Sequence, residues 1–342
     1  MDDQYSITHE GEGLEHVAIL RNGNGTEARV AVGYGFNVFS FKVPCNEELT
    51  EQADVLYAEP GFPRADLRAT ANGTPILVPF PNRIAGGKFT YNGKSYSLPC
   101  NDHGVNAIHG FAFDKPWRLV KESTVGAATF VGEFELNRDS SFTLDHWPGN
   151  FRVRCEVRLQ DRRLLQRFFV TNLASVPIPF GLGTHPYFRM PPTGDGSLNN
   201  CEIGSLAQMQ VVLDKTIPTG QTQTVAGDAE LREMRPIGER KFDDVYTGIE
   251  HPAEGAPHAL ADFTNHLGVE LDHSEAFLYS VVYIPPHRKA ICIEPYTCVT
   301  NAVNMGDTLG HNGPPTGLWH LTPGEVRTVK IELEVVTVKR GS

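Results

Sequence analysis

Histidine and glutamate side chains at two distant points of the chain could together transfer protons. His185 lies between glycine-containing, strand-like residues (180–184) and Pro186, which interrupts ordinary strand pairing. An imidazole titrates near neutrality, with an unperturbed pKa of roughly 6.5. Glu294 follows four apolar residues, 290–293. A carboxylate at the end of a buried strand is costly unless it is paired or functional, so Glu294 is a candidate acid–base group.

Two other segments carry polar groups suited to hydroxyls or a carboxylate. Asn82 and Arg83 follow an apolar stretch and precede a glycine pair, and together they offer several rigid hydrogen-bond donors. His109 precedes Gly110, which lets a ligand or backbone approach closely. Taken singly, Arg83 and His109 are more simply explained as structural residues, so a site requires further partners.

Other site chemistries have weaker support. His103 and His109 match no standard zinc spacing, and no cysteine pair joins them, so we predict no metal site and no cofactor. Asp214, Asp243 and Asp244 could suggest a carboxylate pair for glycoside hydrolysis, but nothing in the sequence places two of them together. We find neither a serine nucleophile elbow nor a glycine-rich phosphate loop.

Composition limits the partners and the compartment. The chain has 342 residues, of which 40% are hydrophobic, and a net charge of −11, which argues against nucleic-acid or anionic membrane partners. No apolar run approaches the roughly 20 residues that span a bilayer, and the start shows no signal segment. Six scattered cysteines fit free thiols in a reducing cytoplasm, and we predict a cytoplasmic protein; they are Cys45, Cys100, Cys155, Cys201, Cys292 and Cys298.

The dominant hydrophobic period is two, which predicts antiparallel strands. Apolar and polar residues alternate over 151–159 and again over 329–335. Asn92-Gly93 between two short strand-like segments is the strongest hairpin signal. Helices should be few and short, with candidates at 46–49 and 229–234. The pattern predicts a large all-β sandwich or barrel, most simply one domain over residues 1–342.

Four segments together resemble the aldose 1-epimerase (galactose mutarotase) family. They are Asn-Arg-Ile-x-x-Gly-x-Phe at 82–89, His-Gly at 109–110, His-Pro-Tyr-Phe at 185–188 and the late Glu294, in the order and rough spacing of that family. The resemblance extends from about Gly33 to the last strand. It implies an antiparallel β-supersandwich with an open sugar-binding cleft and no cofactor, which agrees with the period-two pattern.

The resemblance also implies a role for each residue. Glu294 is similar to the family's general base; with a reference pKa of roughly 4.3 it would be ionised at neutral pH. His185 is similar to the family's general acid, and nearby carboxylates would keep it cationic. His109 would hydrogen-bond the sugar near the ring oxygen, and Arg83 with Asn82 behind it would hold sugar hydroxyls. An aspartate of the family also binds sugar hydroxyls, and Asp243 or its neighbour Asp244 could supply it here; we prefer Asp243. The match departs at 112–113, where many relatives have a basic residue after His-Gly-Phe.

The implied activity is exchange between the α and β anomers of a free hexose such as glucose or galactose. Two alternatives share the fold. A hexose-6-phosphate 1-epimerase would need arginines converging on a phosphate, with Arg83, Arg152 and Arg154 as candidates. A non-catalytic sugar-binding protein would bind the aldose without accelerating the exchange. The sequence leaves a monomer and a homodimer as alternatives.

Overall fold

Antiparallel β-sheets make up most of the computed structural model, which describes residues 4–45, 51–194 and 196–339. The predicted all-β antiparallel class is confirmed. The turn expected at residues 46–49 lies outside the described residues. The described residues form three large sheets of five, eight and nine strands and three smaller sheets of two strands each.

The nine-stranded sheet forms one long layer. The alternation expected over 151–159 is confirmed, because the apolar residues of that strand are buried and the polar residues between them are not. In sheet order, its strands are β11 (Arg118–Ser123), β12 (Ala128–Glu135), β13 (Phe151–Gln160), β14 (Arg163–Asn172), β28 (Val326–Thr337), β24 (Leu267–His273), β23 (His258–Asp262), β18 (Glu202–Ser205) and β21 (Arg235–Pro236).

The other two large sheets lie along this layer. The five-stranded sheet contains β1 (Tyr5–Glu10), β2 (Val17–Asn22), β3 (Glu27–Ala31), β4 (Asn37–Pro44) and β5 (Gln52–Asp54). The eight-stranded sheet contains β20 (Ile217–Thr224), β19 (Ala207–Asp214), β22 (Asp243–Ile249), β25 (Tyr279–Tyr283), β26 (Ala290–Tyr296), β16 (Gly183–Thr184) and β6 (Ile76–Leu77), with β17 (Tyr187–Arg189) also paired to β26.

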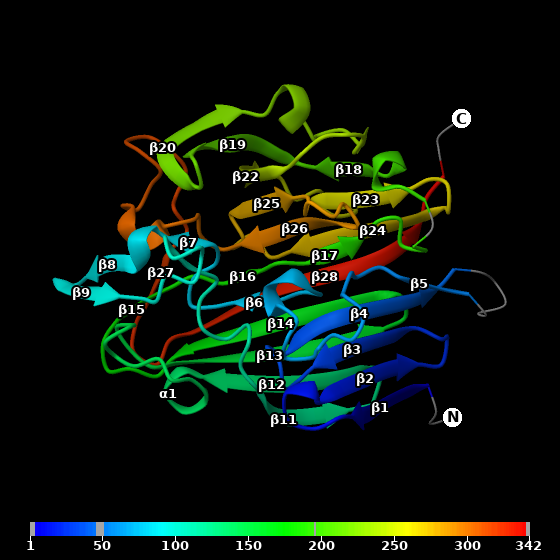
Figure 1. The fold of residues 1–342 in the computed structure, drawn as a ribbon, viewed down its shortest axis with the longest axis horizontal. Coiled ribbons are helices and arrows are strands. Elements are labelled where there is room, and N and C mark those ends of the chain that lie inside the picture. The colour runs from blue at the N-terminus through cyan, green and yellow to red at the C-terminus, as the bar shows by residue number, and fades with distance from the viewer. Residues whose placement is uncertain (1–3, 46–50, 195, 340–342) are drawn as a thin grey trace.

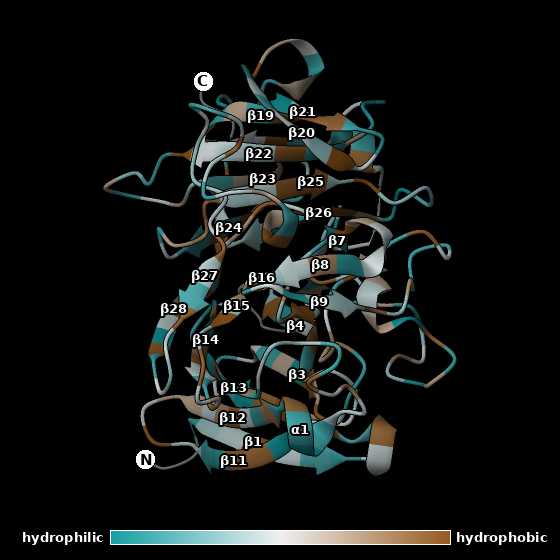
Figure 2. Ribbon diagram, turned by 90° about the vertical axis from the view of Figure 1, so that its left-hand side faces the viewer, coloured by the Kyte–Doolittle hydropathy of each residue, from teal (hydrophilic) through white to brown (hydrophobic). Residues whose placement is uncertain are grey.

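Each of these sheets covers a different end of the nine-stranded layer. The five-stranded sheet packs on its β12 and β13 end, where β2 contacts both strands (Figure 1). The eight-stranded sheet lies at the β23 and β24 end, and Val282 and Ile293 share one core cluster there with Leu260 and Val269. Figure 2 shows the division from the side, with β1 and β11 at one end and β19–β22 at the other. One face of the eight-stranded sheet therefore packs against the core, and a functional site would lie on the opposite face.

Short elements complete the fold. The two-stranded pairs are β7 (Arg83–Ile84) with β10 (Ala107–Ile108), β8 (Lys88–Tyr91) with β9 (Lys94–Ser97), and β15 (Ile178–Phe180) with β27 (Trp319–Leu321). The predicted Asn92-Gly93 hairpin is confirmed as the turn from β8 to β9, with both residues at positive φ. The helix α1 spans Leu136–Asp139, and 3₁₀ turns span Gly13–Glu15, Ala69–Ala71, Ala85–Gly87, Leu198–Asn200, Gly227–Ala229 and Ala302–Asn304.

The prediction of a helix at 229–234 is wrong. The chain makes a 3₁₀ turn that ends at Ala229 and then passes through a bend at 232–233 into β21. The backbone N–H of Ser205 in β18 donates to the carbonyl of Leu231, so this segment is bound to the edge of the nine-stranded sheet instead of coiling on itself.

All six cysteines are free thiols, as expected from their spacing. Among the described residues, no helix is long and apolar enough to cross a membrane.

Candidate active site

Strand register places His185 opposite Glu294. On one side Gly183 pairs with Tyr296, and on the other Tyr187 pairs with Cys292. Both pairs belong to one antiparallel register. Residue 185 lies midway between 183 and 187, and residue 294 lies midway between 292 and 296, so His185 is directly opposite Glu294. The atoms His185 Nε2 and Glu294 Oε1 lie 3.3 Å apart, and both residues are buried. Directly opposed side chains of neighbouring strands are the closest contacts in a sheet, so the fold builds this pair from its own hydrogen-bond ladder.

Local residues adapt the strands to this pair. Pro186 has no N–H to donate, which explains why strand pairing stops between β16 and β17. Gly183 is required by its partner, because a Cβ there would lie 2.4 Å from Cδ1 of the Tyr296 ring. With that space free, the Tyr296 hydroxyl donates a hydrogen bond to Glu294 Oε2. The carboxylate is thus held at one oxygen by Tyr296, while the other oxygen faces His185.

The same register brings Asp243 to this face of the sheet. Asp243 pairs with Tyr283, and Tyr283 pairs with Cys292, two residues before Glu294 on β26. Side chains two residues apart share a face, so Asp243 and Glu294 lie on one side of the sheet. Asp244 points to the other side, where its Oδ1 accepts from Gln210 at 2.7 Å. The geometry therefore places Asp243 on the face of Glu294 and Asp244 on the opposite face, and it does not join the two aspartates as a dyad.

Asn82, Arg83 and His109 come together on a separate polar loop. β7 and β10 pair Arg83 with Ile108, and the His109 N–H donates to the Asn82 carbonyl at 2.9 Å. Arg83 donates from Nη1 to Asn82 Oδ1 at 3.1 Å. Asn82 and His109 have positive φ values of 55° and 68°, which are unusual for residues other than glycine. Such backbone conformations are enriched at functional sites and are held here by the surrounding hydrogen bonds.

Two residues that sequence reasoning did not single out fix this loop. Asp102 Oδ2 accepts from Arg83 Nε at 2.7 Å, so the guanidinium has one edge anchored. Asn101 binds both backbone polar groups of Ile108: its Oδ1 accepts from the N–H at 2.8 Å and its Nδ2 donates to the carbonyl at 3.1 Å. These bonds hold the residue that immediately precedes His109.

The loop meets the sheet face at the two histidines. The His109 and His185 rings contact edge to face, with centroids 5.6 Å apart. His185 also stacks on Tyr187 with centroids 4.6 Å apart, which fixes its ring plane. The buried Nδ1 of His109 has no hydrogen-bond partner within the described part of the chain. An imidazole nitrogen in such a position is suited to contact a bound molecule.

Burial dominates the electrostatics of the pair. It raises the pKa of Glu294 well above its ordinary value, with the nearby Asp243 adding to the rise; the Tyr296 hydrogen bond and Arg83 oppose it. Burial also lowers the pKa of His185 to about 3. The pKa of His109 falls well below 6.5 because of burial first and then the neighbouring His185 and Arg83.

The expectation that nearby carboxylates keep His185 cationic is therefore wrong for the free protein. Burial penalises both charged forms, so the proton of the pair is favoured on Glu294 with His185 neutral. Sequence reasoning assigned both groups near-reference pKa values because it could not show how deeply they are buried.

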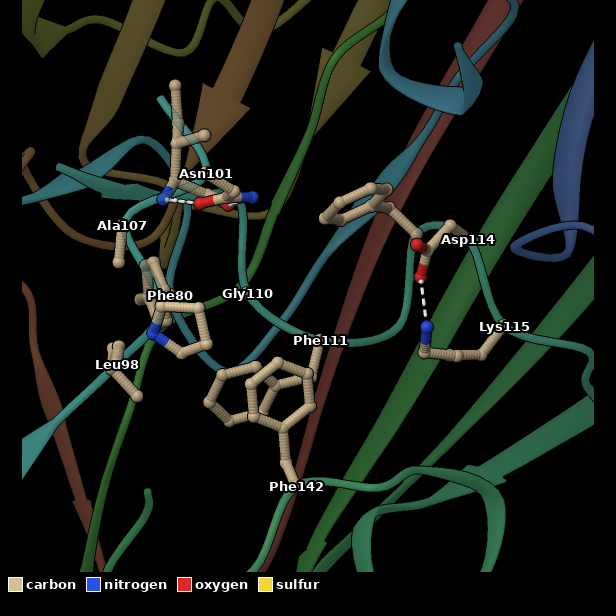
Figure 3. Close-up of a pocket in the computed structure, with 12 residues that line it drawn as sticks. Phe80, Leu98, Asn101, Ala107, Gly110, Phe111, Asp114, Lys115 and Phe142 are labelled. Atoms are coloured by element: carbon tan, nitrogen blue, oxygen red, sulfur yellow. Dashed lines mark hydrogen bonds and ion pairs between the residues drawn. The ribbon is translucent and has the colours of Figure 1, made fainter. Parts of the chain in front are cut away.

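A hollow of about 180 Å³ lies beside His109 but does not contain the pair (Figure 3). Ile108 and Gly110, the two neighbours of His109, line it. Phe111 and Phe142 stack within it with centroids 4.1 Å apart, and Asp114 forms an ion pair with Lys115 at 3.0 Å. Phe113, part of the segment where the sequence departs from the family pattern, also lines it.

Other candidate residues lie away from this centre. Arg152 and Arg154 both face Glu133, at 3.5 and 2.6 Å, within the nine-stranded sheet. The His103 side chain is 94% exposed, whereas His109 is buried, so the two histidines do not share an environment.

The chain belongs to the aldose 1-epimerase family. The family model of that description matches residues 16–334, which include the described site. The family is one of isomerases, and the chain is accordingly an enzyme of that class. The resemblance drawn from the four short segments is thus confirmed.

Individual relatives are distant. An uncharacterised Escherichia coli protein, YihR, is 25% identical over 68% of this chain and 71% of its own length. Mouse galactose mutarotase is 31% identical, but the alignment covers 50% of this chain and 48% of the mouse protein. The chain thus matches about half the length of the mammalian galactose mutarotases.

Solved structures share the fold throughout. A galactose mutarotase-like protein from Clostridium acetobutylicum superposes with a TM-score of 0.86 at 21% identity, covering 98% of this chain and 99% of that one. A galactose 1-epimerase from Lactobacillus acidophilus gives a TM-score of 0.72 at 14% identity, covering 97% and 98%. At these identities the likeness establishes the fold.

Several neighbours of the site were missed from the sequence. Tyr283 and Asp102 carry no individual signal, since each becomes adjacent only through register or loop closure, and Tyr296 was also not singled out. Tyr296 was nevertheless accessible in principle: it lies two residues after Glu294 and so on the same face of a strand.

Proposed function

We propose that this protein interconverts the α and β anomers of a hexose such as glucose or galactose by opening and closing the sugar ring. The observation that carries the proposal is the register that opposes His185 to Glu294 on one sheet face. Anomer exchange requires one proton acceptor at the C1 hydroxyl and one donor at the ring oxygen, and this pair supplies both. Arg83, Asn82, His109 and Asp243 would bind the sugar hydroxyls and the region of the ring oxygen.

The proposed reaction conserves protons. Glu294 accepts the C1 hydroxyl proton as the bond from C1 to the ring oxygen breaks, and His185 donates a proton to that oxygen. The product is the open-chain aldehyde. Rotation about C1–C2 presents the other carbonyl face, and the reverse transfers close the ring. Each positioned acid or base can contribute on the order of 10²–10⁴-fold in rate.

The productive pair carries one proton in total. In the free protein that proton is favoured on Glu294, so the reaction requires its transfer to His185 across the 3.3 Å contact. Arg83 favours the ionised carboxylate and the Tyr296 hydrogen bond does the same, which supports the charged arrangement of the pair once sugar is bound. Such a coupled pair titrates as a unit.

A free hexose is favoured over a hexose 6-phosphate as substrate. Of the three arginines that could have held a phosphate, Arg152 and Arg154 pair with Glu133 and Arg83 pairs with Asp102. Polarimetry with freshly dissolved α-D-glucose and α-D-galactose, compared with α-D-glucose 6-phosphate, tests the proposal. Acceleration of the free sugars supports it, and acceleration of the phosphorylated sugar alone contradicts it. A protein that binds galactose without accelerating the exchange would be a sugar-binding module instead.

We also propose that residues 1–342 form one domain that functions in the cytoplasm as a monomer or homodimer. A single core cluster joins residues of all three large sheets, which supports one domain. Six free thiols suit a reducing compartment.

A further inference from the structure

A buried thiol lies beside the acid–base pair and has no role in the proposed reaction. Cys292 is two residues before Glu294 on β26, so both side chains share one face of the strand. Tyr187 and Tyr283 flank it in the neighbouring strands. The thiol is fully buried and free of any disulfide.

The three donor atoms of this corner are close enough to share one ion. Cys292 Sγ, a ring nitrogen of His185 and a carboxylate oxygen of Glu294 all lie within 4.8 Å of one another. Tetrahedral zinc has bonds of roughly 2.3 Å to sulfur and 2.0–2.2 Å to nitrogen and oxygen, which places its donors roughly 3.3–3.7 Å apart. The His185–Glu294 contact of 3.3 Å already has this spacing. Because the three donors lie within 4.8 Å, the thiol would have to move by at most about an ångström to complete the set.

The donor types select a class of metal. A thiolate with an imidazole and a carboxylate suits borderline-soft divalent ions such as Zn²⁺ and Co²⁺, whereas Mg²⁺ and Ca²⁺ prefer oxygen donors. We propose that Cys292, His185 and Glu294 form a Zn²⁺-binding site, and that Zn²⁺ bound there inhibits the enzyme. The inhibition rests on the proposed function, because the ion would occupy both groups that transfer protons. The existence of the metal site does not rest on the proposed function.

The surroundings would orient two of the ligands. Tyr296 donates to Glu294 Oε2, which leaves Oε1 available on the side of His185. The Tyr187 ring lies parallel to that of His185, within 5°, and fixes its plane. Outer contacts of this kind orient metal ligands in many proteins. Binding replaces two protons: Zn²⁺, Cys292–SH and the protonated Glu294 carboxyl give a zinc complex of the thiolate and the carboxylate and release two H⁺, while His185 binds in its neutral form. The fourth coordination position would remain for water.

Cobalt absorption tests the site independently of catalysis. The chelator-treated protein is titrated with Co²⁺, and the thiolate-to-cobalt charge-transfer band is followed in the near ultraviolet. We expect a band at one equivalent that Zn²⁺ removes and Mg²⁺ does not. It should be absent in Cys292→Ser and Cys292→Ala, and retained in the matched control Cys100→Ser, whose thiol lies outside the group. Two different substitutions of Cys292 are used so that a folding defect in one of them does not decide the result. Circular dichroism verifies that both variants are folded.

Polarimetry with added Zn²⁺ then tests inhibition. We expect stoichiometric Zn²⁺ to abolish mutarotation of galactose, a chelator to restore it, and Cys292→Ser to require at least tenfold more Zn²⁺. A missing cobalt band, or a band that persists in both Cys292 variants, overturns the metal site and leaves the proposed function standing. A Cys292-dependent band in a protein with no metal-free mutarotase activity supports the metal site and rejects the proposed function.

Discussion

His185 Nε2 lies 3.3 Å from Glu294 Oε1 because one antiparallel register runs through both sides of Pro186. The proposed acid–base pair is therefore a cross-strand pair of the eight-stranded sheet, positioned by backbone hydrogen bonds that involve neither side chain. A site of this kind needs little from flexible loops to hold its geometry. The loop that carries Arg83 and His109 places further polar side chains beside a pair that the sheet has already formed.

The pH dependence of activity should reflect a pair that works with one proton. Burial lowers the pKa of His185 to about 3 and raises that of Glu294, so the one-proton state extends below the ordinary histidine pKa. We expect kcat/KM to fall as pH rises through the raised pKa of Glu294 and to show no loss as pH falls through the ordinary histidine pKa. Polarimetry corrected for spontaneous mutarotation measures this profile. A steep loss of rate between pH 7 and pH 5 in protein that remains folded would refute the one-proton pair.

Tyr296→Phe should move the alkaline limb of that profile. Its hydroxyl donates to Glu294 and so lowers the pKa of the carboxyl; without it the pKa rises further. A hydrogen bond to a charged group contributes about 1.5–3 kcal/mol, so we expect the limb to shift upward by about one to two pH units with a kcat loss of about tenfold. Tyr279→Phe is a matched control, because its hydroxyl donates to the Pro315 carbonyl instead. An unshifted limb in Tyr296→Phe would show that the bond does not tune the pair.

Arg83→Lys should weaken sugar binding more than chemistry. The guanidinium bonds Asp102 and Asn82 at once, and a lysine ammonium cannot reproduce that planar geometry. We expect KM for galactose to rise about tenfold while kcat changes by less than about threefold. Arg152→Lys, on the nine-stranded sheet beside Glu133, is the control and should leave both constants unchanged. An equal fall in kcat with constant KM would instead assign Arg83 to the transition state.

The chain should lose stability in mild acid through a second histidine pair. His258 and His273 are buried with their Nε2 atoms 3.2 Å apart, near His251 and Asp272. Burial lowers the pKa of His273 to about 4 and that of His258 well below 6.5. Unfolded histidines bind protons below about pH 6.5, so stability is full above that pH and declines as pH falls toward the folded values.

We expect His273 alone to reduce the free energy of unfolding by about 2 kcal/mol between pH 7 and pH 5. Urea unfolding at the two pH values measures the change. His273→Gln should show a smaller pH dependence than the parent, whereas His103→Gln, which alters an exposed side chain, should not. Equal dependence in His273→Gln and the parent would place the acid sensitivity elsewhere.

The sequence allowed the fold class to be predicted and candidate site residues to be named because their signals are local. The alternation over 151–159 predicts a half-buried strand, and the dipeptide Asn92-Gly93 predicts the hairpin turn that it forms. His185 and Glu294 were recognisable from their immediate neighbours and from the family pattern. Contacts between distant segments were not: Tyr296 has room beside its cross-strand partner because that partner is Gly183, and Asp102 meets Arg83 through a loop.

The charge states of His185 and Glu294 could not be predicted from the sequence either. The reference pKa values of histidine and glutamate suggested a cationic acid and an ionised base, but burial reverses the favoured position of the proton. Similarly, Asp243 and Asp244 are indistinguishable as sequence neighbours, and the pairing of β22 with β25 separates them onto opposite faces.

Replacement of Glu294 by glutamine tests the central claim most directly. Glutamine keeps the size of the side chain and can still contact Tyr296, but it cannot accept the C1 hydroxyl proton. Polarimetry on fresh α-D-galactose, with galactose binding measured by calorimetry on the same sample, separates chemistry from binding. We expect Glu294→Gln to lose at least 10²-fold in kcat while still binding galactose. A variant that binds galactose and retains the parental rate would contradict the assignment of Glu294 as the base.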